Sequence, residues 1–385
     1  MTSNNDKKVL NVPALRFPEF SGEWIHKTID EIFELRNGYT PSKANQSFWN
    51  NGTIPWFRME DIRLNGGILY DAIQHITPEA VKGSGLFEPY SIILATTATI
   101  GEHAMIIADS LANQQFTNFK VRKSLSLRYA PYYLYYYFFR IDKWCLKNTN
   151  AGGLLSVDIP SLKRKPIYAP LIDEQIKIAK LLRLIDERIA TQNKIIEKYE
   201  SLIKGINCKI FALIQGNEYR LGDIATITNG NSNVQDASVE YRVGLYPFFD
   251  RSEDVKYLPT FLFDKESIIY PGEGTEFMPR YYNGKFALHQ RCYAICDFNE
   301  AVNPQFLYFF LKTQNSYFIR NAVGSTVPSL RLDTFQKLKV VIPSKETQYS
   351  VYSFLSTLEQ KLDVENSIMK MLLCQKRYLL RQMFI

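Results

Sequence analysis

The chain has 385 residues, of which 46% are hydrophobic and 22% charged, and this balance excludes a disordered tail protein and a small disulfide-stapled scaffold. No apolar run approaches the roughly 20 residues of a membrane-spanning helix, and the first residues lack the apolar core of a signal peptide, so we expect a soluble, cytoplasmic protein. The formal net charge of +7 fits a polyanionic partner without requiring one.

Strand patterns separated by turn residues come first in each half of the chain. The strands are expected at Ser91–Ala95, Phe116–Val121, Ser267–Tyr270 and Lys337–Ile342. A Tyr- and Phe-rich helix follows at Pro131–Arg140 and at Pro304–Lys312, and its helical spacing makes the rings mostly core residues rather than a stacking platform. Pro170 and Pro343, each followed by acidic residues, then open a long helix.

The two halves are copies of one module. When PYYLYYYFF is laid on PQFLYFFLK, the two long helices coincide without a gap. Near the front, IDEIFELRNG overlies LGDIATITNG and, in the same register, IPWF overlies YPFF. The register changes before Ser91, which falls on Ser267, so the second copy lacks a segment that the first copy has after IPWF. A shared frame with different inserts is expected when a scaffold presents different loops.

Each long helix carries apolar residues at alternating steps of four and three, a heptad pattern typical of a coiled coil. The expected contact positions are Ile178, Leu182, Ile185, Ile189, Gln192, Ile196, Tyr199, Val351, Leu355, Leu358, Leu362, Glu365, Met369 and Leu372. Gln192 and Glu365 are polar exceptions at equivalent places, and we expect them to hydrogen-bond near the middle of an antiparallel pair. The plainer alternative to a coiled coil is a long amphipathic core helix in each half. The plainer alternative for Gln192 and Glu365 is that both face solvent because the contact between the helices loosens there.

These patterns predict an α+β fold in which two tandem β-rich bodies are each followed by a long helix, and the two helices pair as an antiparallel coiled coil. The expected segments are an N-terminal stretch, the first body, its helix, the second body and its helix, at residues 1–24, 25–169, 170–214, 215–342 and 343–385.

Motifs for catalysis are missing from the sequence. The five cysteines form no C-x-x-C pair, and Cys292 and Cys296 have only His289 nearby, so we expect free thiols rather than a zinc site. There is no G-x-x-x-x-G-K-[ST] loop, and no G-x-G-x-x-G opens a helix. The four histidines lack partners at metal or triad spacing, and no carboxylate cluster would hold magnesium. The sequence therefore argues against an enzyme.

The segment from Val12 to Trp24, VPALRFPEFSGEW, resembles the N-terminus of specificity subunits of type I restriction–modification systems. In that family two divergent target-recognition domains are each followed by a helical spacer with a characteristic start. Here this start is PLIDEQ at Pro170–Gln175 and PSKETQ at Pro343–Gln348, the second with its acidic residue shifted. The resemblance covers nearly the whole chain, to about Phe384.

The resemblance implies a non-catalytic subunit in which each target-recognition domain reads one half of a bipartite, asymmetric site in double-stranded DNA. It further implies that two modification (methyltransferase) subunits dock on the chain and that motor–nuclease subunits join them. S-adenosylmethionine, ATP and Mg²⁺ would then bind to those partners, and this chain would hold no cofactor or metal. The alternative is a non-DNA scaffold built from a duplicated, helix-paired module, and a lone methyltransferase or nuclease is a third reading.

Base reading requires donors and acceptors on loops, with basic residues on phosphates. In the first body the candidates are Tyr39, Thr40, Lys43, Asn45, Gln46, Arg58, Thr96, Thr97, Thr99, Gln114 and Gln115. In the second they are Asn231, Ser232, Asn233, Arg251, Thr275, Glu276, Arg280, Tyr281, Tyr282, His289, Gln290 and Arg291. Gln115 can be laid on Gln290 in the alignment of the two bodies, which predicts equivalent glutamines. The plainer reading of each candidate is an ordinary solvated loop residue.

Overall fold

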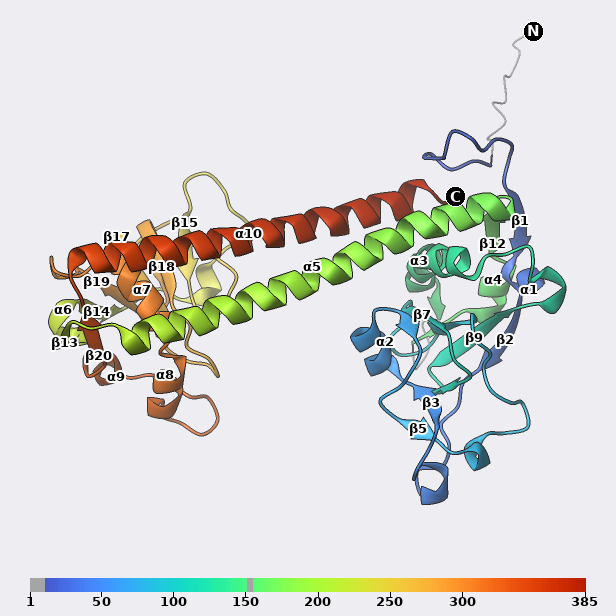
Figure 1. The fold of residues 1–385 in the computed structure, drawn as a ribbon, viewed down its shortest axis with the longest axis horizontal. Helices are drawn as coiled ribbons and strands as arrows, with labels where there is room; N and C mark the ends of the chain where they lie inside the picture. Colours follow the sequence, from blue (N-terminus) through green and yellow to red (C-terminus); the bar gives the residue numbers. More distant parts are fainter. Residues whose placement is uncertain (1–10, 151–154) are drawn as a thin grey trace, which may run out of the picture. The chain divides into compact units, whose positions relative to one another are not determined.

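The computed structural model describes residues 11–150 and 155–385 of the chain. It divides into two compact units: the first runs to Thr191 and also takes in Met369–Ile385, and the second is Gln192–Ile368. Each unit combines a β-rich body with parts of the two long helices, α5 (Ile172–Leu213) and α10 (Lys345–Gln382) (Figure 1). The architecture is the α+β fold with an internal duplication that the sequence predicts. None of the helices in the described part of the chain is long and apolar enough to cross a membrane.

The body of the first unit contains a five-stranded sheet of order β2-β9-β6-β7-β4 and a three-stranded sheet of order β5-β3-β8. Their strands are β2 (Phe33–Asn37), β3 (Ile54–Phe57), β4 (Ile68–Leu69), β5 (His75–Ile76), β6 (Ile92–Ala95), β7 (His103–Ile106), β8 (Leu111–Ala112) and β9 (Phe116–Val121). The helix α2 (Met59–Asn65) lies in the stretch that the second copy lacks. The extra residues of the first copy therefore add a helix and a short strand after β3.

The body of the second unit has one six-stranded sheet of order β14-β19-β17-β18-β15-β16. Its strands are β14 (Thr226–Asn229), β15 (Tyr246–Phe249), β16 (Lys256–Leu258), β17 (Phe263–Pro271), β18 (Arg280–Leu288) and β19 (Cys292–Cys296). The long strand β18 pairs antiparallel with β17 and in parallel with β15. In the first body these two pairings belong to separate strands, β7 with β6 and β8 with β3. One continuous strand thus joins what are two sheets in the first body.

A two-stranded sheet joins the front of each body to the strand that precedes the long helix. β1 (Ile25–Thr28) pairs with β12 (Pro166–Ala169), and β13 (Asn217–Arg220) pairs with β20 (Lys339–Ile342) in the same register. A third pair of this size, in the first body, is β10 (Thr149–Asn150) with β11 (Ser156–Val157). The short helices are α4 (Ile159–Arg164), α6 (Leu221–Ile224), α8 (Asn315–Asn321) and α9 (Leu332–Gln336). The predicted strand at Lys337–Ile342 begins later, at Lys339, because α9 and its cap occupy the first residues.

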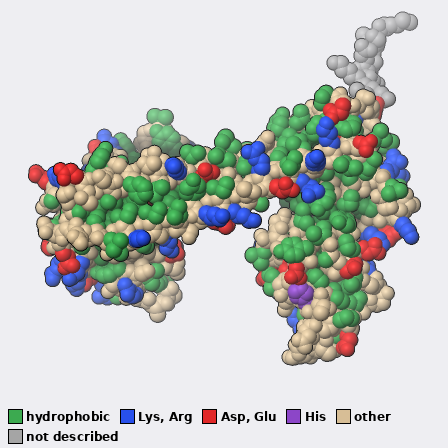
Figure 2. Space-filling model, in the orientation of Figure 1, with side chains coloured by type: hydrophobic (Ala, Val, Ile, Leu, Met, Phe, Trp, Pro, Cys, Tyr) green, Lys and Arg blue, Asp and Glu red, His purple; other side chains and the backbone are tan. Residues whose placement is uncertain are grey.

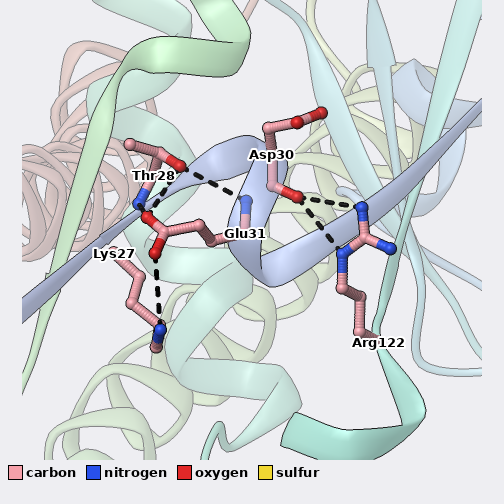
Figure 3. Close-up of polar contacts among 5 residues, drawn as sticks. All are labelled: Lys27, Thr28, Asp30, Glu31 and Arg122. Atoms are coloured by element: carbon pink, nitrogen blue, oxygen red, sulfur yellow. Dashed lines mark hydrogen bonds and ion pairs between the residues drawn. The ribbon is translucent and has the colours of Figure 1, made fainter.

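The short helix α1 (Ile29–Ile32) starts the first body through a capping box, shown in Figure 3. The Thr28 hydroxyl accepts a hydrogen bond from the Glu31 amide at 3.3 Å, and the Glu31 carboxylate accepts one from the Thr28 amide at 2.7 Å. Arg122, which follows β9, donates two hydrogen bonds to the carbonyl oxygen of Asp30 at 3.0 and 3.2 Å. These bonds stabilise the start of the helix and hold it against the sheet.

The aromatic helix of each body is core. In α3 (Pro131–Lys147) the run from Tyr133 to Phe138 is buried, and α7 (Pro304–Lys312) likewise buries Phe306 and Phe309. The predicted end of the first helix at Arg140 is wrong. The helix continues to Lys147 because Ile141 and Cys145 extend its buried face by further turns.

The end of a long helix closes each aromatic core. Phe384, just beyond α10 (Lys345–Gln382), packs on Tyr133 and Tyr137 with ring centroids 5.3 and 5.8 Å apart. Phe211, near the end of α5 (Ile172–Leu213), packs on α7 in the same way, at 5.2 and 5.5 Å from two of its rings. The helix of one half of the sequence therefore completes the core that the other half begins.

The glutamine at the start of each long helix is fully buried and makes three hydrogen bonds to the backbone. The partners of Gln175 are backbone groups of Arg128, Ala130 and Pro170, at 2.9, 3.0 and 2.9 Å. The partners of Gln348 are the equivalent groups of Ala301, Asn303 and Pro343, at 2.9, 2.7 and 3.0 Å. Each amide therefore ties the start of the aromatic helix to the start of the long helix.

The residue before this glutamine differs between the halves for a structural reason. Glu174 is buried and accepts two hydrogen bonds, at 2.7 and 2.8 Å, from Arg16 of the N-terminal segment. The second half has Thr347 in this place. In the register that lays Ile29 on Leu221, the counterpart of Arg16 is Cys208, which lies within α5, so no arginine is supplied there.

The two long helices contact each other and run antiparallel within each unit (Figure 1). In the first unit Asp186 pairs with Lys376 at 2.7 Å. In the second unit Gln192 donates to the Glu365 carboxylate at 2.5 Å and to its carbonyl oxygen at 3.1 Å. Of the heptad positions, Ile178, Leu182, Ile185, Gln192, Leu355 and Leu372 are buried. The half-buried positions are Ile189, Ile196, Tyr199, Val351, Leu358, Leu362, Glu365 and Met369.

Candidate nucleic-acid interface

Backbone hydrogen bonds bring four segments of the first body together. They join Gly38 to Phe116, Asn113 to Phe57, and Thr96 to Gln115, with N–O distances of 2.8, 3.0 and 2.9 Å. The segments are the loop after β2, the end of β3, the loop after β6 and the turn before β9. Because most of the candidate residues lie on these segments, residues that are far apart in the sequence share one site.

The second body repeats the contacts among three of these segments, and Gly272, in the loop after β17, lies against the Arg291 carbonyl oxygen. The bonds of the second body join Gly230 to Cys292, Ser232 to Leu288, and His289 to Phe249, with N–O distances of 3.3, 3.1 and 2.9 Å. The glycine of each Asn-Gly turn is needed for this approach, since a Cβ at Gly38 would lie 2.2 Å from the Asn113 carbonyl oxygen. At Gly230 it would lie 2.0 Å from the Leu288 carbonyl oxygen. Glycine is the residue that permits such close contact between backbones.

The turn before the last strand corrects the sequence alignment. It is closed by a hydrogen bond from Phe116 to Asn113 in the first body and from Cys292 to His289 in the second, at 3.2 and 2.9 Å. Phe116 is therefore the counterpart of Cys292, which moves the alignment by a single position. The prediction that Gln115 and Gln290 are equivalent is wrong: the equivalent pairs are Gln114 with Gln290, and Gln115 with Arg291. A shared residue type in a short loop cannot fix the register, whereas the hydrogen bonds do.

The candidate residues differ in exposure. The exposed ones are Lys43, Asn45, Gln46, Gln114, Asn231, Asn233, Arg251, Thr275, Glu276, Gln290 and Arg291. The half-buried ones are Tyr39, Thr40, Arg58, Thr97, Thr99, Gln115, Ser232, Arg280, Tyr281, Tyr282 and His289, and Thr96 is buried.

In the first body some candidates meet at the loops and others support them. The Thr40 hydroxyl and the Gln114 side chain hydrogen-bond to each other across two loops. The Tyr39 hydroxyl donates to a backbone carbonyl at 3.1 Å and accepts from a backbone amide at 2.9 Å, so its contacts are structural. Thr96 hydrogen-bonds to Thr117 inside the sheet at 3.0 Å. Thr40 and Gln114 are thus the pair available at the surface.

Other candidates of the first body lie apart from this meeting point. Lys43, Asn45 and Gln46 precede or start a short 3₁₀ turn, where the Asn45 side chain forms the cap. Arg58 pairs with Glu60 at 2.9 Å next to α2. The structure therefore places these four candidates outside the group that meets at the loops.

In the second body Arg280 and its two neighbours support the loops. Arg280 donates to the carbonyl oxygens of Asp250, at 3.3 Å, and of Ser252, and so fixes the loop that carries Arg251. Tyr281 packs toward α7, and Tyr282 packs on β15 from the opposite face of the strand. These three side chains therefore stabilise the backbone around the loops, whereas Arg251 remains exposed to solvent.

A cavity of about 600 Å³ lies among the loops of the second body. Its lining includes the charged residues Asp250, Arg251, Lys256, Glu273 and Arg291, together with His289. Asp250 is buried and accepts hydrogen bonds from Lys256 at 2.5 Å and from the Ser252 amide at 2.8 Å. Burial acts to raise the pKa of Asp250, but the hydrogen bonds from Lys256 and Ser252 hold it below its ordinary value.

The sequence analysis missed Asp250, Ser252, Lys256 and Glu273. Little in the sequence marks these residues as candidates for a binding site. Asp250 directly follows a strand, and Glu273 lies between two glycines of a turn. Among residues 11–150 and 155–385, no group of three or more His, Cys, Asp or Glu side chains is placed to hold a metal ion. Cys292 and Cys296 are buried free thiols, and burial raises the pKa of each to about 11.

Comparisons with known proteins agree with the duplicated arrangement. A family model described as the type I restriction modification DNA specificity domain matches residues 21–201 and 216–372. The type I restriction enzyme EcoprrI specificity subunit of Escherichia coli is 44% identical over 169 residues, which are 43% of this chain and 42% of that protein. The MjaIX specificity subunit of Methanocaldococcus jannaschii is 25% identical over 386 residues, with 88% of each chain covered. The match thus spans less than half of the E. coli subunit.

Solved structures share the fold at lower identity. The S subunit of a type I restriction-modification system from M. genitalium has a TM-score of 0.59 at 18% identity, over 97% of this chain and 99% of that chain. A chain from a study of complex assembly and conformational transition in the type I R-M system has a TM-score of 0.61 at 13% identity, over 93% of this chain and 96% of its own.

Proposed function

Because this chain belongs to the type I restriction modification DNA specificity family, whose model matches both of its halves, we propose that it is the DNA-recognition subunit of a type I restriction–modification complex. Each body reads one half of a bipartite, asymmetric site in double-stranded DNA. The chain itself performs neither methyl transfer nor cleavage.

The observation that carries this proposal is that one backbone frame occurs twice with different side chains on its loops. The turn before the last strand presents Gln114 and Gln115 in the first body and Gln290 and Arg291 in the second. Amide and guanidinium groups on such turns are the usual means of reading base edges. Two frames with different tip residues support recognition of two different half-sites.

Partner docking is supported by the apolar surface of the long helices. On α10 the exposed large apolar residues include Tyr349, Phe354, Val364, Met371 and Tyr378. Figure 2 shows hydrophobic side chains gathered along the visible face of this helix. A face of this kind marks an interaction surface. We assign it to two modification subunits, which would carry S-adenosylmethionine and through which motor–nuclease subunits with ATP and Mg²⁺ would join; this chain binds none of these cofactors.

The test is the affinity of the full-length chain for duplex DNA as a function of salt concentration. A DNA reader loses affinity steeply as salt rises, because bound phosphates release counterions. We expect Arg251→Gln, which removes an exposed charge at the cavity, to weaken binding and reduce the salt slope by about one. Lys339→Gln, in an exposed ion pair of the β13–β20 sheet, is the matched control.

Two results would contradict the proposal. A scaffold that organises only proteins would show no duplex binding at low salt. A lone methyltransferase would label DNA from S-adenosylmethionine in the absence of any modification subunit, and the proposal predicts no labelling by the pure chain.

A further inference from the structure

A pair of opposite charges, Arg291 and Glu273, lines the cavity of the second body. Arg291 Nη1 donates to Glu273 Oε1 at 2.6 Å. The Arg291 side chain is 63% exposed, whereas that of Glu273 is 20% exposed. Glu273 therefore orients the guanidinium while most of its donors stay free for a ligand.

Arg291 and Glu273 lie on two neighbouring backbone segments whose conformations are fixed by backbone contacts. Arg291 lies in the turn between β18 and β19, which is closed by the hydrogen bond from Cys292 to His289 at 2.9 Å. Gly272, next to Glu273, lies against the Arg291 carbonyl oxygen, where a Cβ would approach it to 1.9 Å. Because the backbone is set before any ligand binds, little ordering remains to be done on binding.

The frame itself does not require this ion pair. The first body has the same backbone contacts and, in the register that the turn defines, carries Thr97 and Gln115 at the positions of Glu273 and Arg291. An ion pair as exposed as this one also adds little to stability. The ion pair is therefore better explained by a role in ligand binding than by a role in stabilising the fold.

A guanidinium beside a carboxylate matches the major-groove edge of one base pair. Guanine presents two acceptors, O6 and N7, and cytosine presents the N4 donor. An A·T pair would set the adenine N6 donor against the guanidinium and the thymine O4 acceptor against the carboxylate. In a reversed pair, C·G, the cytosine N4 donor would face the guanidinium donors, and the guanine acceptors would face the carboxylate. A T·A pair would offer thymine O4 to the guanidinium and adenine N6 to the carboxylate, but it presents one acceptor and a methyl group where guanine presents two acceptors, so the arrangement favours G·C over the other three base pairs.

We propose that Arg291 and Glu273 together read one G·C base pair in the half-site bound by the second body, Arg291 donating to guanine O6 and N7 and Glu273 accepting from cytosine N4. This inference rests on the proposed function and adds the base pair recognised at one position.

The test is selection of duplexes from a randomised pool by the full-length chain and its variants. The wild-type chain enriches a G·C pair at a defined position of one half-site, and Arg291→Gln lowers that preference about tenfold or more, as for loss of a bidentate base contact. Arg291→Lys, which retains a donor, keeps a weaker preference for guanine. The double variant Arg291→Gln with Glu273→Thr carries the residue types of the first body and moves the preference at that position toward A·T.

One control and three possible outcomes distinguish failure of this inference from failure of the proposed function. Lys339→Gln removes a cation from an exposed ion pair that does not line the cavity, and it leaves every base preference unchanged. If Arg291→Gln weakens all sequences equally, Arg291 contacts a phosphate, so the inference fails while DNA recognition stands. If the variant keeps the wild-type preferences, the inference also fails. A wild-type chain that binds no duplex would overturn the proposed function and the inference with it.

Discussion

The two bodies have the same frame but differ in their strands, inserts and loop tips. In both bodies a buried glutamine ties the aromatic helix to the long helix, and a phenylalanine from the end of a long helix packs on the aromatic helix. A glycine in each body also lies in close contact with the neighbouring turn. The two bodies differ where β18 replaces two strands, where α2 is inserted, and where Gln115 and Thr97 give way to Arg291 and Glu273. The contacts of the glutamine, the phenylalanine and the glycine repeat in both bodies, but the pairing of Arg16 with Glu174 does not. The side chains at the loop tips repeat only in part, as Gln114 and Gln290 do.

This division shows which positions are set by folding and which by binding. A buried amide with three backbone partners has no freedom to vary without loss of stability, because each unsatisfied group costs free energy. A loop tip exposed to solvent makes few such contacts and can change its chemistry at little cost. The duplicated chain therefore provides an internal control for every assignment made on one body.

The largest expected effect comes from a contact that only the first unit has. Arg16→Ala leaves Glu174 buried without its partner, and we expect it to lower the free energy of unfolding by about 3 kcal/mol. Urea unfolding followed for the first unit measures this. Arg16→Ala combined with Glu174→Thr gives the first half the residue type of Thr347 and should recover most of the loss. Lys163→Ala, which breaks the exposed pair with Asp30, is the control and should cost about 0.5 kcal/mol. No recovery in the double variant would refute the explanation for the shifted acidic residue.

A smaller effect, of equal size in the two halves, is expected from substitution of the buried glutamines Gln175 and Gln348. Gln175→Ala and Gln348→Ala each remove three hydrogen bonds from a buried site, and each should cost about 2 kcal/mol of unfolding free energy. Gln360→Ala, at an exposed position of α10, is the matched control and should be nearly neutral. If only one of the two buried substitutions is destabilising, Gln175 and Gln348 do not have equivalent roles. That result would contradict the structural equivalence of the two halves at this site.

The smallest effect concerns the polar pair between the long helices. Gln192→Leu leaves the half-buried Glu365 without its amide donor and should lower stability by about 1 kcal/mol. Replacing both with Leu should raise the melting temperature above that of the wild type while loosening the register of the helices, since polar residues at core positions specify alignment at a cost in stability. Thermal melting and the spacing of the recognised half-sites measure the two effects. A lower melting temperature with unchanged spacing would contradict this account.

The sequence predicted the features that periodicity and repetition encode. The heptads place Gln192 and Glu365 at equivalent positions, and the structure shows them hydrogen-bonded. The strand at Phe116–Val121 and the helix at Pro304–Lys312 agree with β9 and α7. These elements are long enough, or repeated clearly enough, for their pattern to be read directly.

The features that the sequence did not predict are short or non-local. Two-residue strands such as β4 have no period to detect. The pairing of Arg16 with Glu174 joins residues 158 positions apart, and nothing in the local sequence signals it. The match of Gln115 with Arg291 required the hydrogen bonds of the turn, because a one-residue slip in a loop leaves the surrounding pattern unchanged. The cavity residue Asp250 was missed although its partners Ser252 and Lys256 lie two and six residues away, because this spacing matches no known motif.

In the proposed function, each of the two bodies reads its half-site independently of the other. The test is to replace residues 25–150 with the corresponding residues of another family member, to co-express the chain with the modification subunit that is proposed to dock on it, and to map methylated adenines across the genome. The account predicts that one half of the recognised sequence changes while the other half, read by the second body, stays the same. A change in both halves, or in neither, would contradict it.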